Sequence, residues 1–180
     1  MQCKSFPSTQ RGLTLIEGCV TLAIVSILAG TALPSFKDVS KKVVLDGSAG
    51  EIVTDIYFAR SEAVARQQGV RVSFHAAGGG SCLVIHTGAT ADCGCDASGV
   101  AQCTGQAALL KSSFLAAQSG MAVIANVASM RFDPVHGTVT PTGTITLASA
   151  SGPTVQHVVN ILGRVRSCSP NASAKGYKAC

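Results

Sequence analysis

The fold of this chain is decided by one stretch, RGLTLIEGCVTLAIVSILAGTALPSF, at residues 11–36. Within it, residues 13–36 carry a single charge, that of Glu17, in an otherwise uncharged and mostly apolar run. At the rise of an α-helix this run is long enough to cross a bilayer core of about 30 Å. The stretch therefore predicts a transmembrane helix that anchors the chain and contains one carboxylate.

The residues before Gly12 are polar, so a cut after Gly12 would leave the apolar run on the mature protein, whereas an ordinary secretory signal loses it. This arrangement resembles the prepilin signal of type IV pilins and type II secretion pseudopilins. The resemblance implies that residues 1–12 are a leader peptide and that a prepilin peptidase cleaves between Gly12 and Leu13. It also implies N-methylation of Leu13, which stands where phenylalanine is commoner.

A carboxylate inside a bilayer is costly and usually faces a partner within protein. The resemblance implies that Glu17, the fifth residue after the cut, pairs with the new terminal amine of a neighbouring pilin subunit during assembly. The alternative is a glutamate that reaches the lipid headgroups. Lys4 and Arg11 precede the span, so the positive-inside rule places the N-terminus in the cytoplasm and the head in the periplasm. We expect inner-membrane insertion, then incorporation into a fibre in the periplasm or at the cell surface.

Residues 37–69 are expected to continue as an amphipathic helix. Their apolar side chains recur in steps of four and three and form one stripe: Leu45, Ala49, Ile52, Ile56, Ala59 and Ala63. Gly69 is the expected end of the helix, since glycine commonly terminates helices. The stripe predicts packing on the core of a globular head.

The apolar period changes to two after Gly69, which predicts a β-rich head over residues 70–180. The strand candidates are residues 70–75, 82–86, 121–126, 129–132, 138–140, 144–148 and 154–162. Residues 88–106 are expected to be an exposed loop fixed by disulfides, and we assign that loop no function. One long helix followed by many short strands predicts an α+β fold.

Six of the eight cysteines follow the apolar run: Cys82, Cys93, Cys95, Cys103, Cys168 and Cys180. An even number in an exported domain predicts up to three disulfides. We favour pairing Cys168 with Cys180, and the other four then pair among themselves in an order that the sequence leaves open. Zinc binding by Cys93 and Cys95 is disfavoured because zinc ligands usually come in two closely spaced pairs. We expect no metal and no other cofactor.

Three segments resemble, in chain order, landmarks of the GspH/FimT family of minor pilins and pseudopilins: FARSEAV at 58–64, RFDPVHG at 131–137 and ILGRVR at 161–166. The resemblance implies a type IV pilin-like fold, in which a long helix with a membrane half and an amphipathic half packs on an antiparallel sheet. The chain looks most like the FimT branch. There, a Gly-Arg-x-Arg motif is associated with binding DNA during natural transformation, and it maps onto Gly163, Arg164 and Arg166.

The charge distribution agrees with an anionic partner for the C-terminal part. The chain has a net charge of +5, yet all its acidic residues lie at or before Asp133. Residues 134–180 carry only the basic groups Arg164, Arg166, Lys175 and Lys178. Such a one-signed segment attracts polyanions.

The chemistry of the motif suits phosphate. If the segment is extended, Arg164 and Arg166 share one face about two strand rises apart, near the spacing of neighbouring phosphates, and each guanidinium can bind phosphate oxygens in bidentate fashion. Gly163 would let the backbone turn sharply. A Cys168 to Cys180 bridge would hold Lys175 and Lys178 nearby. Since aromatic residues are few, we expect double-stranded DNA bound through its phosphates, without sequence preference and with strong salt dependence.

The alternatives to DNA binding are a structural role and catalysis. A purely structural minor pilin, or a GspH-like secretion pseudopilin, would initiate or cap a fibre through Glu17 and the apolar helix, and its paired arginines would be a solvated strand edge. An enzyme is disfavoured because no paired carboxylates, nucleophile and base motif or phosphate loop stands out.

Overall fold

The structure is a computed structural model that describes residue 12 and residues 14–180. Residues 1–11 of the expected leader 1–12, and also Leu13, lie outside the described residues, so the cleavage and methylation site stays a prediction. The chain divides into two compact units, residues up to Val43 and residues Val44–Cys180, and helix α1 (Leu15–Arg66) contributes to both. Within the part of the chain that the structure describes, no helix combines the length and apolar character needed to cross a membrane.

The first unit contains the beginning of α1. The hydroxyl of Thr14 accepts the backbone N–H of Glu17 at 3.3 Å, which caps the helix. Glu17 is exposed, and so are its apolar neighbours Leu15 and Ile16. The predicted helix is therefore present at Glu17, while the membrane placement and the pairing of its carboxylate stay predictions.

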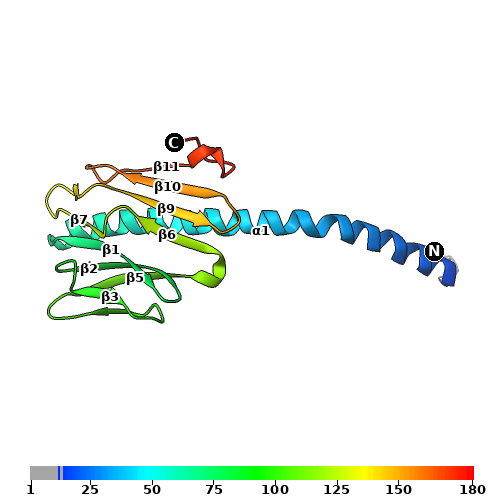
Figure 1. The fold of residues 1–180 in the computed structure, drawn as a ribbon, viewed down its shortest axis with the longest axis horizontal. Coiled ribbons are helices and arrows are strands. Elements are labelled where there is room, and N and C mark those ends of the chain that lie inside the picture. The colour runs from blue at the N-terminus through cyan, green and yellow to red at the C-terminus, as the bar shows by residue number, and fades with distance from the viewer. Residues whose placement is uncertain (1–11, 13) are drawn as a thin grey trace, which may run out of the picture. The chain divides into compact units, whose positions relative to one another are not determined.

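The second unit contains two larger antiparallel sheets and one two-stranded sheet (Figure 1). The first has the order β5-β2-β1-β7-β8 and comprises β1 (Val70–Ala77), β2 (Gly80–Thr87), β5 (Leu109–Ala116), β7 (Ser129–Phe132) and β8 (Val139–Thr140). The second has the order β11-β10-β9-β6 and comprises β6 (Met121–Ala125), β9 (Gly143–Ser149), β10 (Thr154–Val159) and β11 (Val165–Cys168). Short 3₁₀ helices occur at Ala117–Ser119 and Pro170–Ala172. The predicted α+β fold, a helix packed on antiparallel β-structure, is confirmed.

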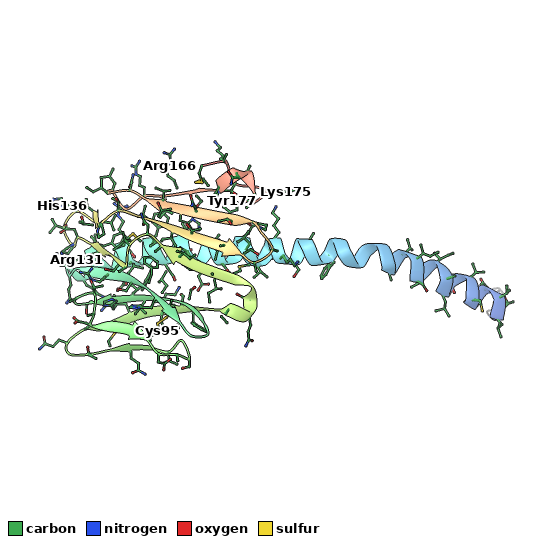
Figure 2. The ribbon with its side chains drawn as sticks, in the orientation of Figure 1. Cys95, Arg131, His136, Arg166, Lys175 and Tyr177 are labelled. Atoms are coloured by element: carbon green, nitrogen blue, oxygen red, sulfur yellow. A yellow bond between two sulfur atoms is a disulfide. The ribbon has the colours of Figure 1, made fainter. Side chains whose placement is uncertain are left out.

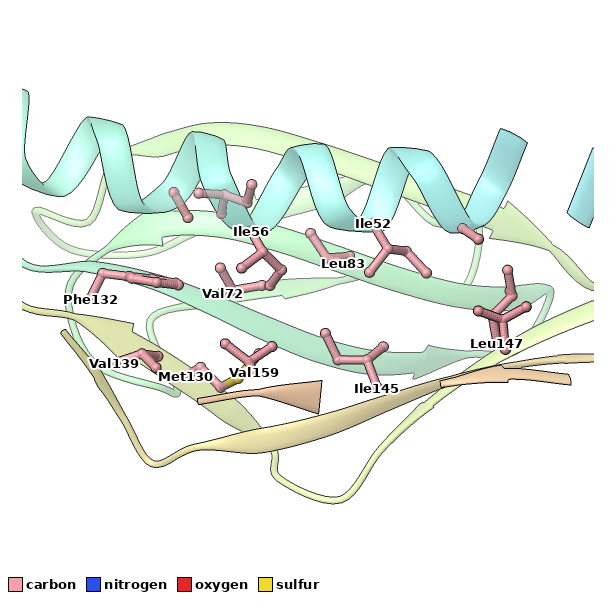
Figure 3. Close-up of a cluster of buried hydrophobic side chains, with 14 of the residues drawn as sticks. Ile52, Ile56, Val72, Leu83, Met130, Phe132, Val139, Ile145, Leu147 and Val159 are labelled. Carbon is pink, nitrogen blue, oxygen red and sulfur yellow. The ribbon is translucent and has the colours of Figure 1, made fainter. Parts of the chain in front are cut away.

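One hydrophobic core joins the C-terminal part of α1 to both sheets (Figure 3). All six residues of the predicted stripe are buried in it. Ile56 faces Val72 and Phe132 of the first sheet, and Ile145 of the second sheet lies in the same core. Because burying one large aliphatic side chain contributes about 1.5–3 kcal/mol, the stripe is a principal reason for the helix to lie against the sheets.

Helix α1 ends three residues before the expected glycine. The backbone N–H of Gln68 donates to the carbonyl of Ala63 at 3.2 Å and that of Gln67 donates to Val64 at 3.3 Å, the hydrogen bonds of a Schellman motif. Gln67 takes the left-handed conformation, with φ of 51°. Gly69 instead makes room for Arg131, since a Cβ at Gly69 would lie 2.5 Å from a guanidinium nitrogen of that side chain.

The expected loop at 88–106 was wrong in part, because it contains the hairpin of β3 (Cys93–Cys95) and β4 (Ala101–Cys103). A disulfide between Cys93 and Cys103 joins the two strands, and a second between Cys82 and Cys95 ties the hairpin to β2. These strands have three residues each, which is too short for an apolar alternation that would predict them. The hairpin is held by its disulfides.

Candidate nucleic-acid interface

The arginine motif lies at the turn between β10 and β11. The side-chain oxygen of Asn160 accepts the backbone N–H groups of Leu162 at 3.1 Å and Arg164 at 3.0 Å. The backbone closes the same turn, because the N–H of Gly163 donates to the carbonyl of Asn160 at 2.8 Å. Asn160, which the sequence analysis did not single out, therefore fixes the position at which Arg164 leaves the turn.

Arg166 lies on β11, an edge strand of the second sheet, opposite Val158 of β10. The intervening Val165 packs against the core, so Arg166 is on the outer face. Arg164 precedes the strand by one residue and shares this exposure. Figure 2 shows Arg166 at the outer edge of the sheet. The structure thus brings the two guanidinium-bearing residues to one exposed strand end.

Gly163 is needed for both backbone and packing reasons. Its φ is +69°, in the left-handed region that favours glycine. A Cβ there would lie 3.1 Å from Cδ of Arg60, 3.1 Å from the carbonyl oxygen of Gly137 and 3.3 Å from a ring carbon of Phe132. The glycine of the motif is therefore buried against the helix and the β7 to β8 turn, while the arginines that follow it face solvent.

The C-terminal tail folds back on itself. The structure pairs Cys168 with Cys180, the pair that the sequence favoured, with 5.0 Å between their Cα atoms. The hydroxyl of Ser169 donates to the carbonyl of Thr154 at 2.8 Å and accepts the N–H of Ala174 at 2.9 Å. These contacts fix the loop on β10, so the exposed Lys175 and Lys178 are held on the same sheet edge as β11.

Tyr177 anchors the tail from the other side. Its ring is partly buried against the core cluster, and its phenol lies near the carboxylate of Asp46 of α1. Burial raises the pKa of this phenol, and the neighbouring carboxylate of Asp46 raises it further. The tail is consequently attached to the helix as well as to β10.

The basic groups of this surface are not neutralised by ion pairs. Salt bridges among the described residues join Arg66 to Glu62, Lys111 to Asp55 and His136 to Asp133. None of them involves the four residues that we call the basic edge: Arg164, Arg166, Lys175 and Lys178. A surface whose four cations lie outside these salt bridges, on a segment that contains no acidic residue, suits a polyanion.

The buried histidines and the cysteines of the head have structural roles. The ring of His86 hydrogen bonds to Ser73 at 2.9 Å inside the first sheet. Burial lowers the pKa of His86 and, more strongly, that of His157, to about 4. Cys93 and Cys95 are in separate disulfides. Among the residues that the structure describes, no group of three or more His, Cys, Asp or Glu side chains is placed to hold a metal ion.

Comparison with known proteins supports the family that the motifs suggest. The family model for type II transport protein GspH matches residues 48–163, more than half of the chain. The pilin-like protein PilA1 of Thermus thermophilus is 35% identical over 77 residues, 43% of this chain and 48% of that protein. The chain therefore spans about half the length of this curated relative.

A solved structure shows the same fold. The type IV minor pilin FimU of Pseudomonas aeruginosa aligns with 74% of this chain and 93% of its own, with a TM-score of 0.50 and 20% sequence identity. At this identity the likeness concerns the arrangement of helix and sheets.

Proposed function

The chain belongs to the GspH family of type II transport proteins, and from this membership and its basic edge we propose that it is a minor type IV pilin that binds double-stranded DNA. The proposed binding is non-specific, through phosphates, and serves DNA uptake in natural transformation. The observation that carries it is the exposure of Arg164 and Arg166 at one strand end, where no salt bridge among the described residues involves either of them.

The geometry supports phosphate binding in two ways. Arg164 and Arg166 are two residues apart around an inward-facing Val165, so their guanidinium groups share a face at about 7 Å of strand rise. Neighbouring phosphates of one DNA strand have a similar spacing, and guanidinium groups match phosphate oxygens in bidentate fashion. Lys175 and Lys178, fixed by the tail disulfide, would extend the contact along the backbone.

Assembly forms the second part of the proposal. A prepilin peptidase would cleave after Gly12 at the inner membrane, and Glu17 would then pair with the terminal amine of another pilin subunit. The exposed apolar side chains at the beginning of α1, such as Leu22 and Ile27, support burial against other subunits or lipid. This same surface favours the second candidate function, a purely structural minor pilin or GspH-like pseudopilin that initiates or caps a fibre.

DNA binding distinguishes the two candidates. The full chain in non-ionic detergent is titrated against a short fluorescent duplex at several salt concentrations, and fluorescence anisotropy is recorded. The variant Arg164→Gln with Arg166→Gln should lose most of the affinity. The control Lys41→Gln with Lys42→Gln removes the same charge from exposed positions on α1 and should retain it. No binding by the parent chain would favour the structural role, and equal loss in both variants would remove the site assignment.

A further inference from the structure

Two arginines of the first sheet lie directly opposite each other. Arg71 of β1 and Arg131 of β7 are register partners, each flanked by buried residues of its strand that face the core. Both side chains therefore project from the outer face of the sheet. Like charges placed directly opposite on neighbouring strands destabilise a sheet, so this pair calls for a compensating group.

The pair lines a cavity of about 260 Å³ together with Asp133, Thr138 and Thr140. Thr140 of β8 is the register partner of Arg131, so the cavity follows one row of side chains across three strands. The cavity offers guanidinium N–H groups and threonine hydroxyls, which can donate to an anion, beside the carboxylate of Asp133. Its volume admits a small tetrahedral oxyanion together with water.

The protein holds the guanidinium of Arg71 in place and leaves room for that of Arg131. Arg71 donates from Nη1 to the hydroxyl of Ser129 at 2.8 Å and from Nε to the carbonyl of Gly88 at 3.4 Å. Arg131 occupies the space left by the missing side chain of Gly69. Burial lowers the pKa of Arg71, and the charge of Arg131 lowers it further. Arg71 is thus preorganised, and Arg131 lies close enough to repel it.

The nearby acids do not cancel this charge. The Oδ1 atom of Asp133 accepts the backbone N–H of Val135 at 3.0 Å and of His136 at 2.8 Å. Asp92 accepts the N–H of Ala89 at 2.7 Å. Its charge raises the pKa of Arg71, but by less than burial and the charge of Arg131 lower it. Among the described residues, no salt bridge joins either acid to either arginine.

We propose that Arg71 and Arg131 bind a phosphate group, with Thr138 and Thr140 as additional donors. The group is either free inorganic phosphate or a phosphate of a DNA backbone. The site does not depend on DNA binding by the basic edge, because its donors are on the other sheet. It is nevertheless linked to that edge, since the turn at 133–137 that borders the cavity reaches Gly163 through Gly137.

The experiment uses the full chain in non-ionic detergent and inorganic phosphate as the probe. Its thermal unfolding is followed in sodium phosphate and in sodium chloride of equal ionic strength, since a ligand of the folded state raises the midpoint. Phosphate should raise the midpoint of the parent chain above its value in chloride. Arg131→Gln should lose this rise and, because repulsion is relieved, should unfold no earlier than the parent in chloride.

The matched control Arg66→Gln removes an exposed arginine of α1 and should keep the phosphate effect. A parent chain that unfolds at the same temperature in both salts would overturn the proposal, as would an undiminished phosphate effect in Arg131→Gln. A duplex titration of Arg71→Gln with Arg131→Gln identifies the source. Affinity lowered several-fold assigns the site to a backbone phosphate, and unchanged affinity assigns it to the free ion. The duplex titration of Arg164→Gln with Arg166→Gln tests DNA binding by the basic edge separately, so failure of one proposal can be distinguished from failure of the other.

Discussion

Arg60 of α1 packs its aliphatic chain against Gly163 of the β10 to β11 turn, where a Cβ would lie only 3.1 Å from the Arg60 Cδ. Gly137 packs against the same side chain, since a Cβ there would lie 3.0 Å from the Arg60 Nε. The three segments through which the sequence resembles its family each contribute one of these residues. The three shared motifs therefore pack against one another at this point. This packing accounts for the glycine of the Gly-Arg-x-Arg motif, whereas it does not account for the two exposed arginines.

Replacing Gly163 by alanine should destabilise the head by about 2–3 kcal/mol, from the left-handed backbone and from overpacking against Arg60. Urea unfolding of the full chain measures this change. Gly105→Ala is a matched control, because Gly105 has a φ of +65° and no atom within 4 Å of the added Cβ. It should cost only about 1 kcal/mol, the backbone part. Equal losses at both positions would show that the Arg60 contact contributes nothing.

Removing the tail disulfide, by Cys168→Ser with Cys180→Ser, should weaken duplex binding several-fold while the sheets stay folded. The physical reason is that the bridge fixes Lys175 and Lys178 beside β11, and an unfixed loop loses entropy when it binds. The bridge spans 12 residues, so its loss should also cost at most about 3 kcal/mol of stability. Anisotropy titration and circular dichroism measure the two effects.

The hairpin disulfide provides the comparison, since Cys93 and Cys103 close a loop of similar size, separated by 10 residues. Cys93→Ser with Cys103→Ser should reduce stability comparably and leave the duplex affinity as in the parent chain. If both double variants lose the same affinity, the effect belongs to general destabilisation and the tail has no special part in binding.

The sequence predicted those elements whose apolar period is complete. All six stripe residues of α1 are buried, and β7 coincides with the expected strand at 129–132. Strand β5 was missed because LLKSSFLA lies at the edge of its sheet and lacks a clean alternation of buried and exposed residues. The expected strand at 154–162 ends earlier, at Val159, because Asn160 begins the turn that carries the arginine motif.

The two candidate sites also differ in how far the sequence predicts them. Arg164 and Arg166 are close in sequence and were predictable as a pair from their spacing. Arg71 and Arg131 are 60 positions apart, and only the register between β1 and β7 brings them together. No local pattern encodes that register, since it follows from how the buried neighbours of both strands pack in the core.

The salt dependence of DNA binding should report the number of phosphate contacts at the basic edge. With four contacts the slope of log K against log salt is about −4, and Lys175→Gln with Lys178→Gln should reduce its magnitude by about 2. Arg164→Gln with Arg166→Gln should change the slope by a similar amount but lose more affinity, because guanidinium groups bind phosphate in bidentate fashion. A slope unaffected by the lysine pair would show that the tail does not touch DNA.

Acid should destabilise the head through His157. Its ring is 1% exposed on β10, Nδ1 hydrogen bonds to the Ser167 hydroxyl at 2.8 Å, and burial lowers its pKa from 6.5 to about 4. Between these two values the unfolded chain binds the proton and the folded chain does not. Stability from this group is therefore complete above pH 6.5 and is lost as the pH falls toward 4, by about 2 kcal/mol between pH 7 and pH 5.

Urea unfolding at both pH values tests the assignment, with His157→Asn as the variant, since asparagine keeps a hydrogen-bonding group near Ser167 and does not titrate. The variant should lose most of the pH dependence. A residual dependence of the same sign is expected from His86, whose pKa is also lowered by burial and which bonds to Ser73. If His157→Asn retains the full dependence, the acid sensitivity arises from other groups.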